Sequence, residues 1–521
     1  MNTDSRCGYI HPQQIRWSEK VTATIPPPWQ QLARTRWRDS MPRHTWAEAN
    51  ADLLARVEEL RPHWLRLAES DAAVNSSAET LARAVSLARL RQPDPEKLAE
   101  LIEHACARLE LKPPAARLKT SGPGPAIARA ADPRWWRRRL RAKSAQAIEH
   151  AAAALGAGPD RARPYCTDAT VRRRKQQHAR NAATLAGLLA VSDRGERIAA
   201  DELAAAGQAN PANRSAEMLV RLRGIERTAA ARGDACAFVT ITAPGYMHPR
   251  AAGSTVPNPN YAGTTPAQAH KHLAALWARA RAALARLDIT ARGMRVVEPH
   301  KDGTPHWHML VWLPPDQMPP ALEVLRAHAL RDTPDEPGAQ AHRFKVEHID
   351  PARGSAIGYV IKYLAKHLPS KGSRTVGDDA DEGDAAPDTR ERIDAWAAVW
   401  GIRRFQFFGI APVTIWRELR RRLDDDTPDP GETLTRAATA AETPDWSAFE
   451  QIAGPIPYYR AAERIHRWEE PPEPNRPDGL ALDRSDEPKP DRLVGLTAAD
   501  GHLRTRTRIW TITQNPRKLA A

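Results

Sequence analysis

The sequence lacks the features that mark membrane-spanning and disulfide-bonded secreted proteins. Its 521 residues include four cysteines, Cys7, Cys106, Cys166 and Cys236, and none of them belongs to a Cys-x-x-Cys pair. No stretch approaches the roughly 20 apolar residues that a membrane span needs, and Met1–Tyr9 has no apolar signal core. We therefore expect reduced thiols in a cytoplasm, with neither a disulfide framework nor a zinc finger.

Two further shortages concern ATP use and negative charge. The chain has no GxxxxGK[ST] phosphate-binding loop, so it is predicted to contain no ATP-driven motor. Acidic residues are in the minority, because 63 Asp and Glu stand against 77 Lys and Arg, and the formal net charge is +14. This excess predicts salt-sensitive attraction to polyanions, of which nucleic acid is the commonest, although anionic membrane surfaces attract basic proteins too.

The pattern of apolar residues predicts an α+β protein with several parts. A chain of this length is expected to form more than one compact domain. Residues 1–125 are predicted to be a helical N-terminal region of unknown role, and 126–232 a basic helical region that contacts DNA. Residues 233–423 mix strands and helices, and 424–521 form a Pro- and charge-rich tail that we expect to be largely disordered.

Two arginine clusters in the basic region are candidates for contact with DNA. One consists of Arg137, Arg138 and Arg139, next to Trp135 and Trp136, and the other of Arg172, Arg173 and Arg174. In one interpretation the clusters follow a DNA backbone while the tryptophans stack on bases. In the other, the arginines belong to a solvated helix face whose tryptophans dock on a core, and both interpretations stay open.

Between residues 233 and 423 the apolar pattern alternates between that of strands and that of helices. Strands are predicted at Ala237–Ala243, Met294–Glu298, His306–Leu313, Arg343–Glu347 and Arg403–Ile410. Helices are predicted at Pro266–Leu287, Ala321–Leu330, Ser355–His367 and Val413–Leu423. The acidic stretch Ser370–Arg390 is predicted to be a mobile loop.

His306-Trp307-His308 is a candidate metal-binding motif. Alternation along a strand sends His306 and His308 to one face and Trp307 and Met309 to the other. Two neighbouring imidazoles can share one cation, but two structural histidines on an exposed strand face would have the same pattern. The residues around the motif distinguish a metal site from a pair of structural histidines.

The segment before this motif supplies a carboxylate. If Lys301-Asp302-Gly303 forms a three-residue hairpin loop with Gly303 in the left-handed conformation, Glu298 lies directly across from His306 on the same face. A two-residue Asp-Gly turn would instead place Glu298 on the opposite face. His300 has the same parity as Glu298 and is the alternative third ligand.

Glu298, His306 and His308 together form a mixed nitrogen and oxygen ligand set. Such a set suits Mn²⁺, Zn²⁺ or Fe²⁺, and Mg²⁺ also fits if substrate phosphate adds oxygens. Two histidines and one carboxylate also describe the metal site of iron oxygenases, so a facial-triad oxygenase is an alternative function.

Two tyrosines are candidate nucleophiles. Tyr359 and Tyr363 are spaced i and i+4 in a predicted helix, so their rings project from one face. Lys362 and Lys366 form a second i, i+4 pair that favours the phenolate form, and Lys366 is also a candidate for contact with DNA. Two tyrosines that only pack on a core would show the same spacing. Next to a metal that polarises a phosphate, however, either phenol could attack phosphorus and form a phosphotyrosine.

These segments resemble the replication gene A proteins of tailed phages, members of the HUH (His-hydrophobe-His) rolling-circle initiator endonucleases. The resemblance covers roughly Asp132–Leu423, and its most specific part is the Glu-to-His-x-His segment combined with the tyrosine pair. The matching segments are Asp132–Leu140, Phe238–Pro244, Val297–His308, Gly358–Tyr363, Trp400–Phe407 and Pro412–Leu419.

The resemblance implies an HUH-endonuclease-like antiparallel sheet flanked by helices, with the histidines on a central strand and the tyrosine helix beside it. It implies an enzyme that nicks one strand of a phage origin, stays on the 5′ phosphate, leaves a 3′-OH primer and later rejoins strands. His306 and His308 would bind Mg²⁺ or Mn²⁺, with Glu298 as third ligand, and Tyr359 and Tyr363 would be the nucleophiles, assisted by Lys362.

The expected partner is single-stranded DNA at a replication origin. Because the chain lacks a phosphate-binding loop, an initiator of this kind would use a host helicase and a host DNA polymerase in the bacterial cytoplasm. Besides the oxygenase, the remaining alternative is a DNA-binding replication protein without catalysis, in which the basic helices do the work and the histidines are structural.

Overall fold

The computed structural model describes residues 10–41, 44–59, 70–92, 94–115, 122–155, 157–159, 163–251, 256–359, 387–421, 430–454, 465–474 and 489–515. The chain divides into two compact units: unit 1 comprises Met1–Pro159 with Pro471–Asp491, and unit 2 comprises Asp160–Glu470 with Arg492–Ala521. In the described part of the chain, no helix has the length and apolar character that crossing a membrane requires. The predicted domain boundaries at 125/126, 232/233 and 423/424 do not coincide with the boundaries of these units.

Unit 1 is helical in its described residues. Its helices are α1 (Pro12–Thr22), α2 (Pro27–Ser40), α3 (Trp46–Glu59), α5 (Asp71–Arg91), α6 (Pro95–Arg108), α7 (Gly124–Ala131) and α8 (Pro133–Ala154). Asp94 and Asp132 cap α6 and α8, each followed by a proline at the first helical position. The apolar faces of α5, α6 and α8 meet in one core that contains Val74 and Leu98. The helical character predicted for residues 1–125 is therefore present in the described residues of this range.

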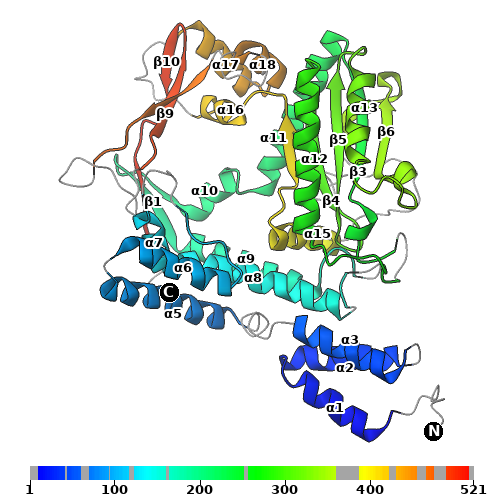
Figure 1. Ribbon diagram of the computed structural model, residues 1–521. Helices are drawn as coiled ribbons and strands as arrows, with labels where there is room; N and C mark the ends of the chain where they lie inside the picture. The colour runs from blue at the N-terminus through cyan, green and yellow to red at the C-terminus, as the bar shows by residue number, and fades with distance from the viewer. Residues whose placement is uncertain are drawn as a thin grey trace. The chain divides into compact units, whose positions relative to one another are not determined.

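The centre of unit 2 is a five-stranded antiparallel sheet with the strand order β6-β3-β5-β4-β7 (Figure 1). The strands are β3 (Ala235–Thr242), β4 (Arg292–Pro299), β5 (Pro305–Leu313), β6 (Phe344–Ile349) and β7 (Phe405–Phe408). All neighbouring pairs are antiparallel. The five predicted strands and the α+β class are thus confirmed, with β5, which carries His306 and His308, in the middle of the sheet.

Helices cover both faces of this sheet. On one face, α12 (Pro266–Arg286) packs on β5, and its His270 accepts a hydrogen bond from Trp307 Nε1 at 3.3 Å; Figure 1 shows α12 lying along the sheet. This face also meets α13 (Met318–Ala329). The opposite face, which we call the histidine face, carries His306, His308 and Glu298 and is covered over its apolar half by α11 (Pro211–Arg232).

The rest of unit 2 is built around this sheet. Its further helices are α9 (Asp168–Ala186), α10 (Ala200–Ala206), α15 (Pro387–Trp400), α16 (Val413–Leu419), α17 (Glu432–Glu442) and α18 (Trp446–Ala453), with short helical turns at Gly245–Met247, Ala339–Arg343 and Pro351–Arg353. Two three-stranded sheets complete it, with the orders β11-β1-β2 and β10-β9-β8. Their strands are β1 (Leu188–Ser192), β2 (Arg197–Ala199), β8 (His466–Glu470), β9 (Arg492–Ala498), β10 (Gly501–Arg504) and β11 (Trp510–Gln514).

The region 126–232 is not helical throughout, because β1 and β2 interrupt it. Its first long helix, α8, belongs to unit 1, whereas α9, α10 and α11 belong to unit 2. Leu189 and Val191 on β1 pair with strands on both sides, and one of these strands, β11, comes from the far end of the sequence. The partner of β1 is therefore too distant in sequence for local periodicity to indicate it.

The expectation of a largely disordered tail is wrong for residues 430–454, 465–474 and 489–515. Trp446 and Phe449 on α18 are fully buried and pack on α11, while Leu434 on α17 is buried beside them. The fit depends on Gly224 of α11, because a Cβ at that position would lie 2.5 Å from the Cβ of Trp446. Frequent Pro and charged residues hide this short helical pair, which contributes directly to the core of the sheet.

Candidate metal and tyrosine site

The hairpin between β4 and β5 determines which residues face one another. His300 donates its backbone N–H to Thr304 O at 2.8 Å, and Gly303 donates to His300 O at 2.8 Å. Gly303 has a φ of 87°, in the left-handed region that glycine adopts without a Cβ clash. The predicted three-residue loop is confirmed, and Glu298 therefore pairs with His306.

This register brings three possible metal ligands together. The ligand atoms of Glu298, His306 and His308 all lie within 4.8 Å of one another. His306 Nε2 is 2.8 Å from His308 Nε2, which is 3.8 Å from Glu298 Oε2. Ligand atoms on adjacent sides of one divalent ion lie about 3 Å apart, because each is about 2.1 Å from the ion. The donor set therefore fits a single cation held by two imidazoles and one carboxylate.

Neighbours on β3 hold His308 in one orientation. Thr240 Oγ1 is 3.0 Å from His308 Nδ1, and the ring of Phe238 stacks on the imidazole with centroids 5.4 Å apart. When His308 binds a metal through Nε2, its Nδ1 keeps the hydrogen and donates it to Thr240 Oγ1. Thr240 and Phe238 therefore fix the orientation of this candidate ligand.

His300 lies next to the three candidate ligands but is not part of the converging group. Its ring packs on that of His306 with centroids 4.1 Å apart and meets His248 edge-on at 5.2 Å. Burial lowers the pKa of His300 to about 4, so the ring is neutral at physiological pH. Among the described residues, the converging group contains Glu298 and not His300. The geometry thus favours Glu298 as the third ligand.

The loop of the hairpin is anchored from two sides. Asp302 accepts a hydrogen bond from the backbone of Thr304 at 2.9 Å and lies 3.0 Å from His248 Nδ1. Burial acts to raise the pKa of Asp302, but the hydrogen bond and charge of His248 bring this pKa below its ordinary value. Trp396 of α15 donates its indole N–H to Gly303 O at 2.8 Å. These contacts keep the loop, and with it the register, in place.

Tyr359 is the nucleophile candidate that the structure describes. The predicted tyrosine helix begins at Ala356, and Ser355 Oγ accepts the backbone N–H of Ile357 at its start. The ring of Tyr359 is half-buried and contacts Phe238 with centroids 5.9 Å apart. Since Phe238 also stacks on His308, one aromatic ring contacts both the tyrosine and a metal-ligand candidate. Lys362, Tyr363 and Lys366 lie outside the described residues.

We expect Thr240→Val to weaken metal binding about tenfold, because the variant keeps the side-chain shape but loses the acceptor that orients His308. Titration calorimetry of the full chain with MnCl₂ measures this loss. The matched control is Thr242→Val, since Thr242 lies across from His306 on the same strand and face. Equal affinities of the two variants would contradict a positioning role for Thr240.

The side chains of the first arginine cluster and its two tryptophans differ in their exposure to solvent. Arg138 on α8 is exposed, whereas the guanidinium of Arg139 lies 4.0 Å from the ring centre of Trp135. Trp136 is fully buried and donates its indole N–H to Ala130 O at 2.7 Å. For Trp136 the interpretation as a core residue is therefore right, and this ring is not available to stack on a base.

The second cluster, on α9, belongs to unit 2. Arg172 is exposed, but Arg174 donates to Asp394 of α15 at 2.6 Å, and the next residue, Lys175, pairs with Glu391 at 2.7 Å. These contacts attach α9 to α15. Because the two clusters lie in different units, each is a separate basic segment, and their assignment to DNA stays a prediction.

A sequence profile of the bacteriophage replication gene A protein (GPA) family matches residues 76–371, more than half of the chain. The chain belongs to this family. The resemblance predicted from the sequence is thereby confirmed. The matched range contains the β4–β5 hairpin and Tyr359, so the family match includes the converging side chains.

Individual relatives come from phages and prophages. The replication gene A protein of Escherichia phage 186 is 38% identical over 307 residues, 58% of this chain and 44% of the relative. The replication protein of Haemophilus phage HP1 is 34% identical over 337 residues, 64% of this chain and 42% of the relative. A probable replication endonuclease from a prophage-like region of Salmonella paratyphi A is 30% identical over 342 residues, which make up 63% of this chain and 42% of the relative. The chain thus spans less than half the length of these relatives, and no solved structure matches it.

Proposed function

We propose that this protein is a rolling-circle replication initiator that nicks one strand of a phage origin through a tyrosine and later rejoins strands. The observation that carries the proposal is the convergence of Glu298, His306 and His308 on a face where Tyr359 packs one ring away. The name of the Salmonella relative, a probable replication endonuclease, points to the same activity.

The chemistry follows from these side chains. A divalent ion, Mg²⁺ or Mn²⁺, held by Glu298, His306 and His308 would neutralise charge on the scissile phosphate. The phenol of Tyr359 or Tyr363 loses its proton and its oxygen bonds to phosphorus, while the bond from phosphorus to the 3′ oxygen breaks. Lys362 stabilises the phenolate. The 3′ oxygen takes up a proton, and the 5′ phosphate stays on the tyrosine.

The reverse reaction joins strands. A 3′-OH attacks the phosphotyrosine, and the tyrosine leaves, so the bond is re-formed without ATP. Two tyrosines spaced i and i+4 in the sequence would allow one to hold a 5′ end while the other cuts again. In this proposal the enzyme acts in the host cytoplasm with a host helicase and a host polymerase. ATP-stimulated unwinding by the purified chain would contradict that division of labour.

The test is a covalent adduct. The full chain is incubated with Mn²⁺ and labelled single-stranded oligonucleotides that tile the replicon from which the gene comes. We expect one oligonucleotide to give a protein–DNA band that survives denaturant and disappears on digestion with protease. If no oligonucleotide on either strand gives such a band, a DNA-binding protein without catalysis is the better assignment. Iron-dependent oxidation of a co-substrate without any adduct would indicate the facial-triad oxygenase.

A further inference from the structure

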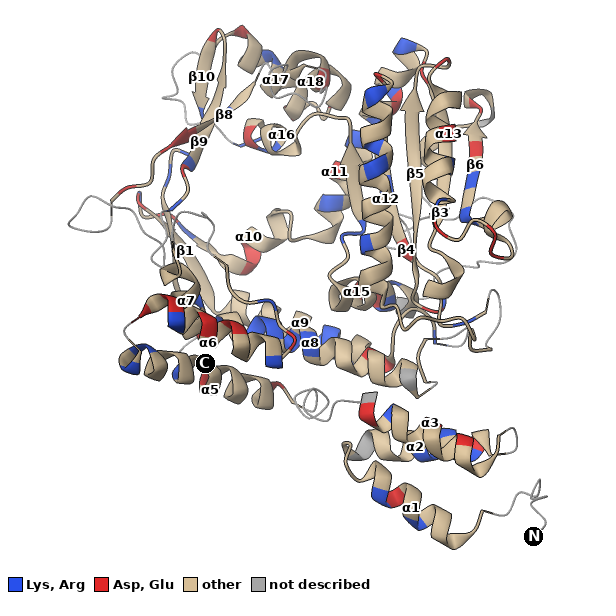
Figure 2. Ribbon diagram, viewed as in Figure 1, with Lys and Arg blue, Asp and Glu red and all other residues tan. Residues whose placement is uncertain are grey.

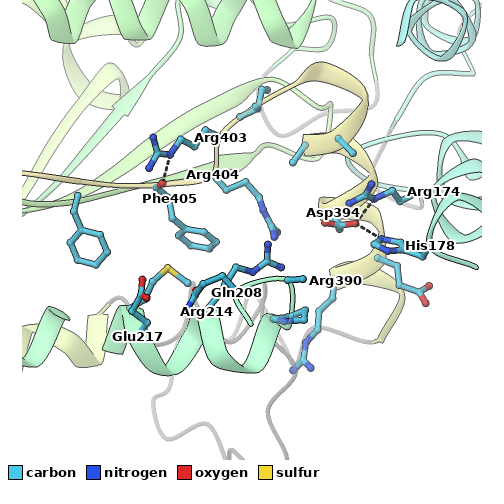
Figure 3. A pocket seen from close by; sticks show the side chains of 18 of the residues that line it. Arg174, His178, Gln208, Arg214, Glu217, Arg390, Asp394, Arg403, Arg404 and Phe405 are labelled. Atoms are coloured by element: carbon cyan, nitrogen blue, oxygen red, sulfur yellow. Dashed lines mark hydrogen bonds and ion pairs between the residues drawn. The ribbon is translucent and has the colours of Figure 1, made fainter. Parts of the chain in front are cut away.

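A large pocket adjoins β7 in unit 2. Its volume is about 1300 Å³, above the roughly 300–1,000 Å³ of ordinary small-molecule sites. Residues of α9, α11, α15, β7 and α16 line it, and Figure 3 shows their side chains from close by. Nothing in the local sequence pattern indicates this pocket, because its lining combines two stretches, 171–221 and 390–417, that are far apart along the chain.

Positive charge dominates the lining, which has eight basic side chains and three carboxylates. The basic side chains are Arg174, Lys175, Arg214, Arg221, Arg390, Arg403, Arg404 and Arg417. Each carboxylate already pairs with one of them, Asp394 with Arg174, Glu391 with Lys175 and Glu217 with Arg417. The pocket therefore keeps a strong excess of positive charge after its internal ion pairs are formed.

Several of these arginines have unused hydrogen-bonding capacity. Within the described part of the chain, Arg214, Arg390 and Arg403 form no ion pair, and the buried Nε atoms of Arg221 and Arg390 have no acceptor. Burial lowers the pKa of Arg221 to about 10, which still leaves it charged at neutral pH. Figure 3 shows Arg214 and Arg404 pointing toward one another from opposite walls. Buried donors and facing like charges are the features that a bound phosphate would satisfy.

Two phenylalanines add an aromatic surface. Phe405 and Phe407 line the pocket and are half-buried, and the guanidinium of Arg221 lies 3.8 Å from the ring centre of Phe407. They pair with Val296 and Met294 on β4, so their side chains lie on the histidine face. Partly exposed aromatic rings among arginines are the usual surface for stacking unpaired bases.

One end of the pocket adjoins the metal-ligand candidates. Val297, the neighbour of Glu298 in sequence, donates its backbone N–H to Arg404 O at 2.7 Å. The positive charge of Arg404 is close enough to interact with the carboxylate of Glu298. A DNA strand that runs along β7 away from the three candidate ligands would therefore enter the pocket directly.

We propose that this pocket binds the single-stranded segment of DNA next to the scissile phosphate. The inference rests on the proposed nicking function and deepens it. Arg214, Arg403 and Arg404 would contact backbone phosphates, and Phe405 and Phe407 would stack on bases. Stacking requires unpaired bases, since a duplex hides their faces, so the pocket selects single-stranded over double-stranded DNA.

The test compares two double variants with the same loss of charge. Arg214→Gln with Arg403→Gln removes two exposed pocket arginines, so the fold is spared. Arg223→Gln with Arg286→Gln is the control, because both side chains are exposed and neither lines the pocket. Arg223 lies on the same helix as Arg214, but the positions of α11 that line the pocket, 214, 217, 218 and 221, share one helix face to which position 223 does not belong. Arg286 lies on α12, which also carries many basic residues (Figure 2), so general attraction to DNA is matched.

Binding of a labelled oligothymidylate of about 15 nucleotides is measured by fluorescence anisotropy in EDTA, where no cleavage occurs. We expect the pocket variant to bind about tenfold more weakly, with a salt dependence of log K reduced by about 1.4, roughly 0.7 for each lost phosphate contact. The control should stay within about threefold of the unmodified protein. Equal affinities and equal salt slopes of the two variants would overturn the proposal, as would competition by thymidine monophosphate at equal phosphate concentration.

A second measurement separates this proposal from the nicking function. In the proposed pathway, a His306→Ala variant forms no adduct but binds the oligothymidylate as the unmodified protein does in EDTA. Failure of nicking therefore leaves the binding result intact. Conversely, if the unmodified protein forms the adduct but the two double variants bind the oligothymidylate equally well, the proposal for the pocket is contradicted and the nicking function is not. With cleavable DNA, the pocket variant should need more DNA for half-maximal adduct formation, with an unchanged rate at saturation.

Discussion

Replacing both Tyr359 and Tyr363 with phenylalanine is expected to reduce covalent adduct formation by on the order of a thousandfold or more, because both candidate nucleophilic oxygens are removed. Phenylalanine keeps the ring, so the contact of residue 359 with Phe238 is retained and the fold should not change. The adduct is quantified on a denaturing gel after incubation with Mn²⁺ and the cleaved oligonucleotide. Each single variant should keep part of the activity, since one nucleophile remains.

Tyr246→Phe serves as the control for this pair. Its hydroxyl donates to Asp332 at 2.8 Å on another part of unit 2, so this variant also loses a tyrosine oxygen with a defined partner. It should form the adduct at the rate of the unmodified protein. An undiminished adduct in the Tyr359 and Tyr363 double variant would show that another group attacks the phosphate.

The second large effect concerns the metal. His308→Ala is expected to abolish Mn²⁺-dependent cleavage, a loss on the order of a thousandfold, because one of the three converging candidate ligands is removed. EDTA should have the same effect on the unmodified protein. In contrast, affinity for single-stranded DNA in EDTA should stay within about threefold, since phosphate contacts by arginine supply most of it. Cleavage and binding are measured on the same oligonucleotide.

Thermal unfolding gives a readout that is independent of cleavage. Mn²⁺ at 100 times its dissociation constant should stabilise the unmodified protein by about 2.7 kcal/mol, and His308→Ala should lose this gain. His348→Ala is the matched control, because His348 is an exposed residue on β6 of the same sheet. If Mn²⁺ stabilises His308→Ala as strongly as the control, His308 is a structural residue and not a ligand.

The hairpin that builds this site is predictable because its determinants are local. Strand alternation places His306 and His308 on one face, and the position of Gly303 selects the three-residue loop that brings Glu298 opposite His306. The five strands of the sheet follow from the same short-range patterns. The contact of Thr240 with His308 could not be predicted, because local sequence patterns do not indicate that β3 pairs with β5.

The features that the sequence conceals depend on contacts between distant segments. The helices α17 and α18 are short, and frequent proline and charge around them resembles disorder, yet Trp446 fits against Gly224 more than two hundred residues earlier. Likewise, the basic pocket combines α9 with α15 and β7, so no single stretch carries its signature. The burial of Trp136 could not be told from a stacking role, because a tryptophan beside arginines suits both environments.

The pairing of β11 with β1 has a consequence for how the protein is made. Thr513 donates its hydroxyl to Leu189 O across 324 positions of sequence, and β1 keeps one edge open until residues 510–514 arrive. On the ribosome, at about 5–20 residues per second, that edge stays exposed for many seconds after β1 has emerged. Such long-range closure slows folding and makes the nascent chain a target for chaperones. The sheet around β1 can therefore form only after residues 510–514 have been synthesised.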